Sequence, residues 1–150
     1  YISIYIVMNI GAFACILLMK RGGKYIEEIE ELSGVSKNHP MMSFGLLIIL
    51  FSLAGIPPLA GFFAKFYIFM AVIESEMYTL AIVGLVTTVL SAFYYIRIIK
   101  IMYFDEPKKP FEKFVDYRIH GPIVLSCILL VSFFIYPSIL NEIVSNISIF

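Results

Sequence analysis

The stretch LAGIPPLAGFFAKFY, residues 53–67, decides the fold of this chain. It lies inside an apolar run from 41 to 73, which would form a helix of about 50 Å at about 1.5 Å per residue. A hydrocarbon core is only about 30 Å thick, so a straight helix of this length does not fit one crossing. The residues that interrupt the run are Gly55, Pro57, Pro58 and Gly61. We predict two half-helices with a break between Gly55 and Gly61.

The prolines of this break also leave backbone acceptors open. Each removes a backbone N–H and disfavours the helical conformation of the residue before it, which frees the carbonyls of Leu53 and Ala54. Non-helical backbone at membrane depth is tolerated only where protein covers it or where it lines a wet cavity. A break of this kind therefore indicates an internal, functional position.

Lys65 is the one charged residue of the 41–73 run. If the span ends near Glu74, Lys65 lies about 13 Å inside the membrane, close to the midplane. The lysine stem reaches only about 6 Å, so snorkelling to the surface falls short. An ionisable group at this depth costs about 2.5 to 3.5 kcal/mol and is typical of ion pathways and proton relays. Since desolvation disfavours the ammonium, a lysine held here can exchange its proton.

The composition is that of an integral membrane protein. Hydrophobic residues make up 61% of the chain and charged residues 15%, with a mean hydropathy of +0.94. The formal net charge of zero argues against a nucleic-acid partner, because such proteins carry a net basic surface. We expect an all-α membrane protein in contact with the lipid bilayer, with residues 1–150 forming one transmembrane domain.

Four apolar stretches are long enough to cross a bilayer. They cover residues 1–19, 41–73, 77–96 and 121–140. All basic residues except Lys65 fall in the two connections 20–40 and 97–118. By the positive-inside rule both loops are cytoplasmic, or face the matrix in a mitochondrion, and the Glu74–Glu76 turn faces the other side.

Two shorter amphipathic segments are expected to be helical. Lys24 to Leu32 shows helical spacing of apolar residues, with Gly34 as its C-cap. Its acidic residues could bind cations, but a solvated face paired with Lys24 is favoured. After Pro137, the tail is predicted to lie along the membrane interface.

A stripe of hydroxyl side chains runs along the third span. Its members are Thr87, Ser91 and Tyr94, with Thr88 and Tyr95 beside them. The stripe could carry a water chain to Lys65. Gly84, Thr88 and Ser91 could equally form a small-residue packing face, and the sequence leaves both interpretations open.

No partner for Lys65 and no cofactor site is apparent in the sequence. All carboxylates lie outside the apolar cores, so the counter-ion must come from upstream helices or another subunit. Cys15 and Cys127 are interpreted as buried apolar residues, and His39 and His120 as membrane-edge residues. No metal spacing, phosphate-binding loop or nucleophile–base pair is present, so we expect no cofactor and no metal.

The run 53–67 closely resembles the broken helix of the antiporter-like membrane subunits of respiratory complex I. Further similar pieces are Met8–Phe13, Asn38–Pro40 and Tyr94–Arg97. The resemblance implies that the four spans are the C-terminal part of a larger antiporter-like helical bundle, packed against other membrane subunits. It also implies that Lys65 lies on a proton route. Within the family, a lysine followed by Phe-Tyr favours the subunit N branch, the counterpart of mitochondrial subunit 2, over the M branch, which has a glutamate here.

Several functions stay open at this point. The favoured one is a proton-translocating, non-redox subunit of NADH:quinone oxidoreductase in a bacterial or mitochondrial inner membrane. The runner-up within the superfamily is a subunit of a cation/proton antiporter. A structural assembly subunit, in which the break serves packing alone, is the third. The chain opens on Tyr1 without a basic leader, so we expect helices of the same protein upstream. A transport role demands a carboxylate and lysine pair there.

Overall fold

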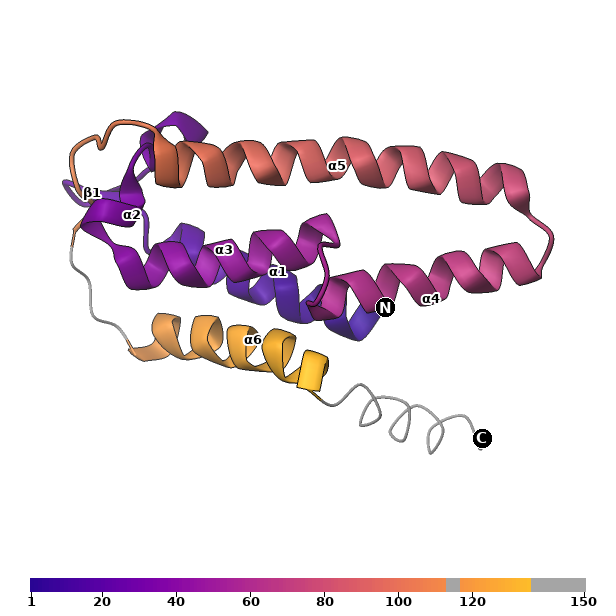
Figure 1. The fold of residues 1–150 in the computed structure, drawn as a ribbon. Helices are drawn as coiled ribbons and strands as arrows, with labels where there is room; N and C mark the ends of the chain where they lie inside the picture. Colours follow the sequence, from indigo (N-terminus) through magenta and orange to yellow (C-terminus); the bar gives the residue numbers. More distant parts are fainter. Residues whose placement is uncertain (113–116, 136–150) are drawn as a thin grey trace.

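The structure is a computed structural model that describes residues 1–112 and 117–135 (Figure 1). The described part is a helical bundle with one short hairpin. Its elements are α1 (Ile2–Leu17), β1 (Lys20–Arg21), β2 (Lys24–Tyr25), the 3-10 helix η1 (Ile29–Leu32), α2 (Val35–Asn38), α3 (Pro40–Ala54), α4 (Ala60–Glu74), α5 (Tyr78–Phe104) and α6 (Tyr117–Ile135).

The long helix α5 runs antiparallel beside α3 and α4, which follow one another end to end (Figure 1). Helices α1 and α6 pack against each other and against α3. The connection from α1 to α3 and the one that follows α5 meet at one end of the bundle, and the α4–α5 turn lies at the opposite end. This places the two basic loops together at one end of the bundle.

The predicted break is present between α3 and α4. Helix α3 begins with Pro40 in its first turn, where a missing N–H costs nothing. It ends at Ala54 and is capped by Gly55, whose φ of 81° and ψ of 34° are left-handed. Helix α4 then begins at Ala60, one position before the predicted limit at Gly61. The chain therefore leaves and re-enters helical geometry around Pro57 and Pro58.

Small residues allow α1, α3 and α6 to approach closely. A Cβ added at Gly11 would lie 2.7 Å from Ile49 Cδ1 and 2.9 Å from Ser126 Cβ. The Ser126 hydroxyl, in turn, donates to the carbonyl of Val7 at 3.0 Å. Small side chains and interhelical hydrogen bonds are the usual means of helix association in membranes.

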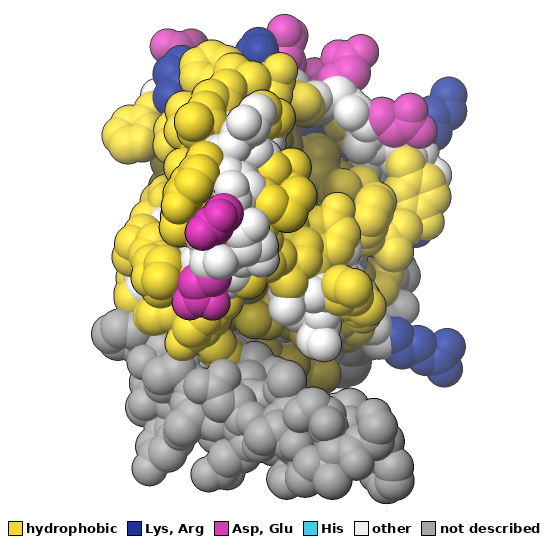
Figure 2. All heavy atoms as spheres, turned by 90° about the vertical axis from the view of Figure 1, so that its right-hand side faces the viewer, with side chains coloured by type: hydrophobic (Ala, Val, Ile, Leu, Met, Phe, Trp, Pro, Cys, Tyr) yellow, Lys and Arg dark blue, Asp and Glu magenta, His cyan; other side chains and the backbone are white. Residues whose placement is uncertain are grey.

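The count of four membrane spans is not confirmed by helix length. Within residues 1–112 and 117–135, α5 is the one helix long and apolar enough to cross a membrane, while α1, α3 and residues 118–133 are shorter apolar helices. Viewed toward the α4–α5 connection, the part of the surface that belongs to described residues is mostly hydrophobic (Figure 2). Helix α5 continues past the predicted limit of 96 to Phe104, because no proline interrupts it before Pro107. Helix α6 starts at Tyr117, earlier than the predicted 121.

The predicted helix from Lys24 to Leu32 is wrong. Strands β1 and β2 pair in antiparallel register instead, and only Ile29–Leu32 form a 3-10 helix. Gly22 and Gly23 have φ values of 61° and 74°, which suit the tight turn of a two-residue hairpin. Gly34 does adopt a left-handed conformation, but it precedes α2 rather than capping a helix over 24–32. The tail segment after Pro137 and the end of the predicted fourth span lie outside the described residues.

Candidate functional site at the helix break

Lys65, on the second turn of α4, reaches back across the break to α3. Its Nζ donates a hydrogen bond to the carbonyl oxygen of Leu53 at 2.8 Å. In a continuous helix the Leu53 carbonyl would accept the N–H of residue 57, but Pro57 has none. The lysine therefore occupies a carbonyl that the proline leaves open, as the sequence predicts for Leu53. In this chain the Lys65 side chain is half-buried.

A second bond crosses the break in the other direction. The Gly61 N–H, a first-turn donor without a partner inside α4, donates to the Ser52 hydroxyl at 3.0 Å. Ser52 is 0% exposed. A Cβ at Gly61 would lie 1.8 Å from the Ser52 carbonyl oxygen, so only glycine fits there. Gly61 was predictable from the sequence but Ser52 was not, because a serine in an apolar helix shows no spacing signal until its partner is known.

Gly55 leaves room for the lysine. Its positive φ of 81° is unfavourable for other residues, and an added Cβ would lie 3.1 Å from Lys65 Cδ and 3.5 Å from Nζ. The Gly55 N–H and the Ile56 N–H donate to the last turn of α3, each at 3.0 Å. Pro57 and Pro58 lie exposed between the half-helices. The break is thus an ordered, hydrogen-bonded connection.

No ion pair within residues 1–112 and 117–135 involves Lys65. The ion pairs present lie at the loop end and around the end of α5: Arg21–Glu31 at 2.6 Å, Lys108–Glu31 at 3.0 Å and Lys100–Asp105 at 2.5 Å. The one hydrogen-bond partner that the described chain gives the Lys65 ammonium is a neutral carbonyl.

The hydroxyl stripe of α5 bonds to its own helix. Thr87 Oγ1 donates to the Gly84 carbonyl and Ser91 Oγ to the Thr87 carbonyl, both at 2.9 Å. Thr87 and Tyr94 are exposed and Ser91 is half-buried. Within the described chain no hydrogen bond joins these residues to Lys65. An added Cβ at Gly84 would lie 2.8 Å from Phe69 of α4, so this part of α5 is a close helix contact.

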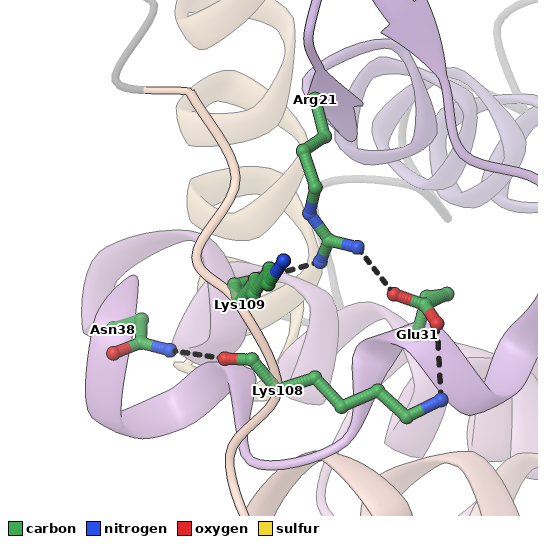
Figure 3. Close-up of polar contacts among 5 residues, drawn as sticks. All are labelled: Arg21, Glu31, Asn38, Lys108 and Lys109. Atoms are coloured by element: carbon green, nitrogen blue, oxygen red, sulfur yellow. Dashed lines mark hydrogen bonds and ion pairs between the residues drawn. The ribbon is translucent and has the colours of Figure 1, made fainter.

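The two basic loops are tied together at the other end of the molecule (Figure 3). Glu31 accepts hydrogen bonds from Arg21 and Lys108, and these bonds, that of Arg21 first, hold the pKa of its carboxyl below the ordinary glutamate value. Arg21 also donates to the Lys109 carbonyl, and Asn38 donates to the Lys108 carbonyl at 3.2 Å. These contacts fix the loops to each other rather than to the break.

The remaining candidate residues have structural surroundings. His39 stacks on Phe111 with ring centroids 5.9 Å apart, and His120 lies near the start of α6. Cys15 is buried and Cys127 half-buried, and both are free thiols. In the part of the chain that the structure describes, no group of three or more His, Cys, Asp or Glu residues is placed to hold a metal ion.

The broken helix and the lysine bonded across it are the features on which the resemblance to antiporter-like membrane subunits rests. The sequence model of the family described as NADH:quinone oxidoreductase/Mrp antiporter, transmembrane, matches residues 1–91. The chain belongs to this family.

Individual relatives place the chain within the family. NADH-quinone oxidoreductase subunit N of Pelagibacter ubique is 58% identical over 99% of the chain, and that of Rhodospirillum rubrum 44% over 95%. These matches confirm the predicted resemblance to subunit N. The chain spans about a third of these relatives' length, 32% and 29%. A chain of respiratory complex I from Thermus thermophilus, solved with bound aureothin, has a TM-score of 0.75 at 25% identity and matches 90% of this chain and 31% of its own.

Proposed function

We propose that this chain forms part of a proton-translocating membrane subunit of NADH:quinone oxidoreductase, with Lys65 as its proton carrier. The relatives' names support the enzyme complex over a separate cation/proton antiporter. The observation that carries the proposal is the Lys65 Nζ bonded to the open Leu53 carbonyl at the break. A scaffold needs no ionisable group there, whereas a relay does.

The proposed role is non-redox. We expect this chain to bind no cofactor and no metal, with NADH oxidation and quinone reduction on other subunits. Energy from those steps reaches this chain as a change in the charges around Lys65. Its partners are other membrane subunits, upstream helices of the same protein and the lipid bilayer, in a bacterial inner membrane or the inner membrane of a mitochondrion.

The proposed topology has four spans. The α3–break–α4 unit makes one crossing, and α1, α5 and α6 make the others. Loops 20–40 and 97–118 face the cytoplasm or matrix. In support, these loops are hydrogen-bonded to each other at one end of the bundle.

Proton transfer follows from the chemistry of the break. The Leu53 carbonyl accepts a hydrogen bond from the ammonium and so favours the protonated form, while removal from water favours the neutral amine. A carboxylate brought near from outside this chain shifts the balance toward the ammonium, and its neutralisation shifts it back. Water along Thr87, Ser91 and Tyr94 is the proposed path to and from Lys65.

The test asks whether the group at position 65 must titrate. In assembled complexes Lys65→Met should cut proton-coupled NADH:quinone turnover several-fold, because a thioether carries no proton. Lys65→Arg should also lose much of the activity, because a guanidinium does not deprotonate. Lys37→Met, the same change at an exposed lysine of α2, is the control and should pump normally. Full pumping by Lys65→Arg would show that charge alone suffices and would refute the relay.

A further inference from the structure

Two hydrogen bonds cross the break side by side, in opposite directions. Lys65 of α4 donates to the Leu53 carbonyl of α3, and Gly61 of α4 donates to the hydroxyl of Ser52, the residue before Leu53. Gly61 and Lys65 are four positions apart on one helix, so they lie on the same face, one turn above the other. Together the two bonds join the end of α3 to the beginning of α4.

The two bonds differ in whether their strength changes when Lys65 gains or loses a proton. A Lys65 that exchanges its proton changes the strength of its bond to Leu53 at every cycle. The Gly61–Ser52 bond carries no titrating group, and the 0% exposure of Ser52 keeps water from replacing it. The 1.8 Å separation of a hypothetical Gly61 Cβ from the Ser52 carbonyl oxygen shows how closely the backbones approach there. The serine is therefore the fixed connection and the lysine the variable one.

We propose that Ser52 is a positioning residue for Lys65. Its hydroxyl holds the first turn of α4 in the register at which the Lys65 ammonium, one turn later, meets the Leu53 carbonyl. This inference rests on the proposed function of Lys65 and adds a second residue to the site. Without the hydroxyl, the buried Gly61 N–H has no hydrogen-bond acceptor. The first turn of α4 must then move to bring this N–H to another acceptor.

The chain offers a matched control on the same helix. Ser43 is also 0% exposed on α3, but its hydroxyl donates at 2.9 Å to the carbonyl of His39, four positions earlier. Ser43→Ala therefore removes a buried hydroxyl without removing a bond across the break. If Ser52 contributed only general packing, both serine substitutions would have similar effects.

The experiment uses the full-length subunit assembled in its respiratory complex, in membrane vesicles. Assembly is checked on native gels, and the protons moved per NADH oxidised are measured. Ser52→Ala should lower this ratio on the order of fivefold, as expected for a buried donor left unsatisfied. Ser43→Ala should leave the ratio unchanged. Ser52→Thr, which keeps the oxygen acceptor, should restore most of it. If Ser52→Ala does not assemble, Ser52→Cys, with a weak sulfur acceptor, should show an intermediate loss.

A double substitution separates this inference from the function on which it rests. If Ser52 acts through Lys65, adding Ser52→Ala to Lys65→Met causes no further loss. Normal ratios in Ser52→Ala, or in Ser52→Cys where it stands in, would overturn the positioning role, as would an equal loss in Ser43→Ala. A normal ratio in Lys65→Met would instead overturn the proposed function.

Discussion

At the scale of residues, the energetics of Lys65 show what the chain supplies and what it lacks. A lysine near the membrane centre costs about 2.5 to 3.5 kcal/mol on insertion scales. A hydrogen bond to a charged group returns about 1.5 to 3 kcal/mol. The single bond to Leu53 therefore offsets much of this cost, and no ion pair within residues 1–112 and 117–135 offsets the rest. A charge supplied from outside the described residues would therefore complete the stabilisation of the ammonium.

Glu31 carries the pH dependence of the loop end. The hydrogen bonds from Arg21 and Lys108 lower its pKa, so its contribution to stability is complete above the ordinary glutamate pKa and is lost as pH falls through the lowered value. We expect hydrogen-exchange protection of the Lys108 N–H, which donates to the Ser33 carbonyl at 3.2 Å, to fall over that acidic range.

Glu31→Gln serves as the control for this prediction. A glutamine does not titrate, so the variant should show weaker protection at neutral pH and, after correction for intrinsic exchange rates, no decrease over the acidic range. The same pH response in Glu31→Gln would assign the transition to another group.

At the scale of elements, the sequence predicts the broken helix but not the hydrogen bond that joins its two halves. Two prolines within a long apolar run predict a break regardless of tertiary contacts, because proline has no backbone N–H to donate in any fold. The Ser52–Gly61 bond depends on how the two half-helices meet, which no local pattern encodes. The helix predicted over 24–32 failed for a related reason. Its apolar spacing fits a helix, but the Gly22–Gly23 turn favours a hairpin in which Lys24 and Tyr25 form the second strand.

Closing the break should disable the site. With Pro57 and Pro58 both replaced by Ala, the N–H of residue 57 can bond to the Leu53 carbonyl, and Lys65 loses its acceptor. We expect the complex to assemble and proton pumping, followed with a pH-sensitive dye, to fall several-fold.

Pro122, which lies inside α6 away from the break, provides the comparison. Pro122→Ala removes a proline from another helix and should pump normally. Unchanged pumping in the assembled Pro57→Ala, Pro58→Ala double variant would support a break that serves packing alone.

At the scale of the whole molecule, the arrangement of loops predicts a topology. The basic connections lie together at one end, and the α4–α5 turn lies at the other (Figure 1). Single cysteines at Lys24 and Lys109, without other reactive cysteines, should therefore react with an impermeant reagent only from the cytoplasmic side. A cysteine at Glu76 should react only from the opposite side. Labelling of Glu76 and Lys109 from one side would refute the four-span topology.

The sequence predicted the helical class and a helix break with a lysine beside it, because hydropathy, proline chemistry and an isolated charge are local properties. It did not predict the end of α5 at Phe104 or the bonds that tie Glu31 to Arg21 and Lys108, which join residues far apart in the chain. The hydroxyl stripe shows the same limit. The spacing predicts that Thr87, Ser91 and Tyr94 share one face of a helix, but it does not predict which residues that face contacts.

The most direct test of the central claim is the number of protons moved per electron pair in the assembled complex. Electron transfer takes place on other subunits in this account, so the ratio isolates what the Lys65 site contributes. We predict that Lys65→Met complexes still oxidise NADH with an artificial acceptor at the normal rate, and that they move fewer protons per electron pair to quinone than the wild type. An unchanged ratio in assembled Lys65→Met complexes would contradict the claim that Lys65 carries protons.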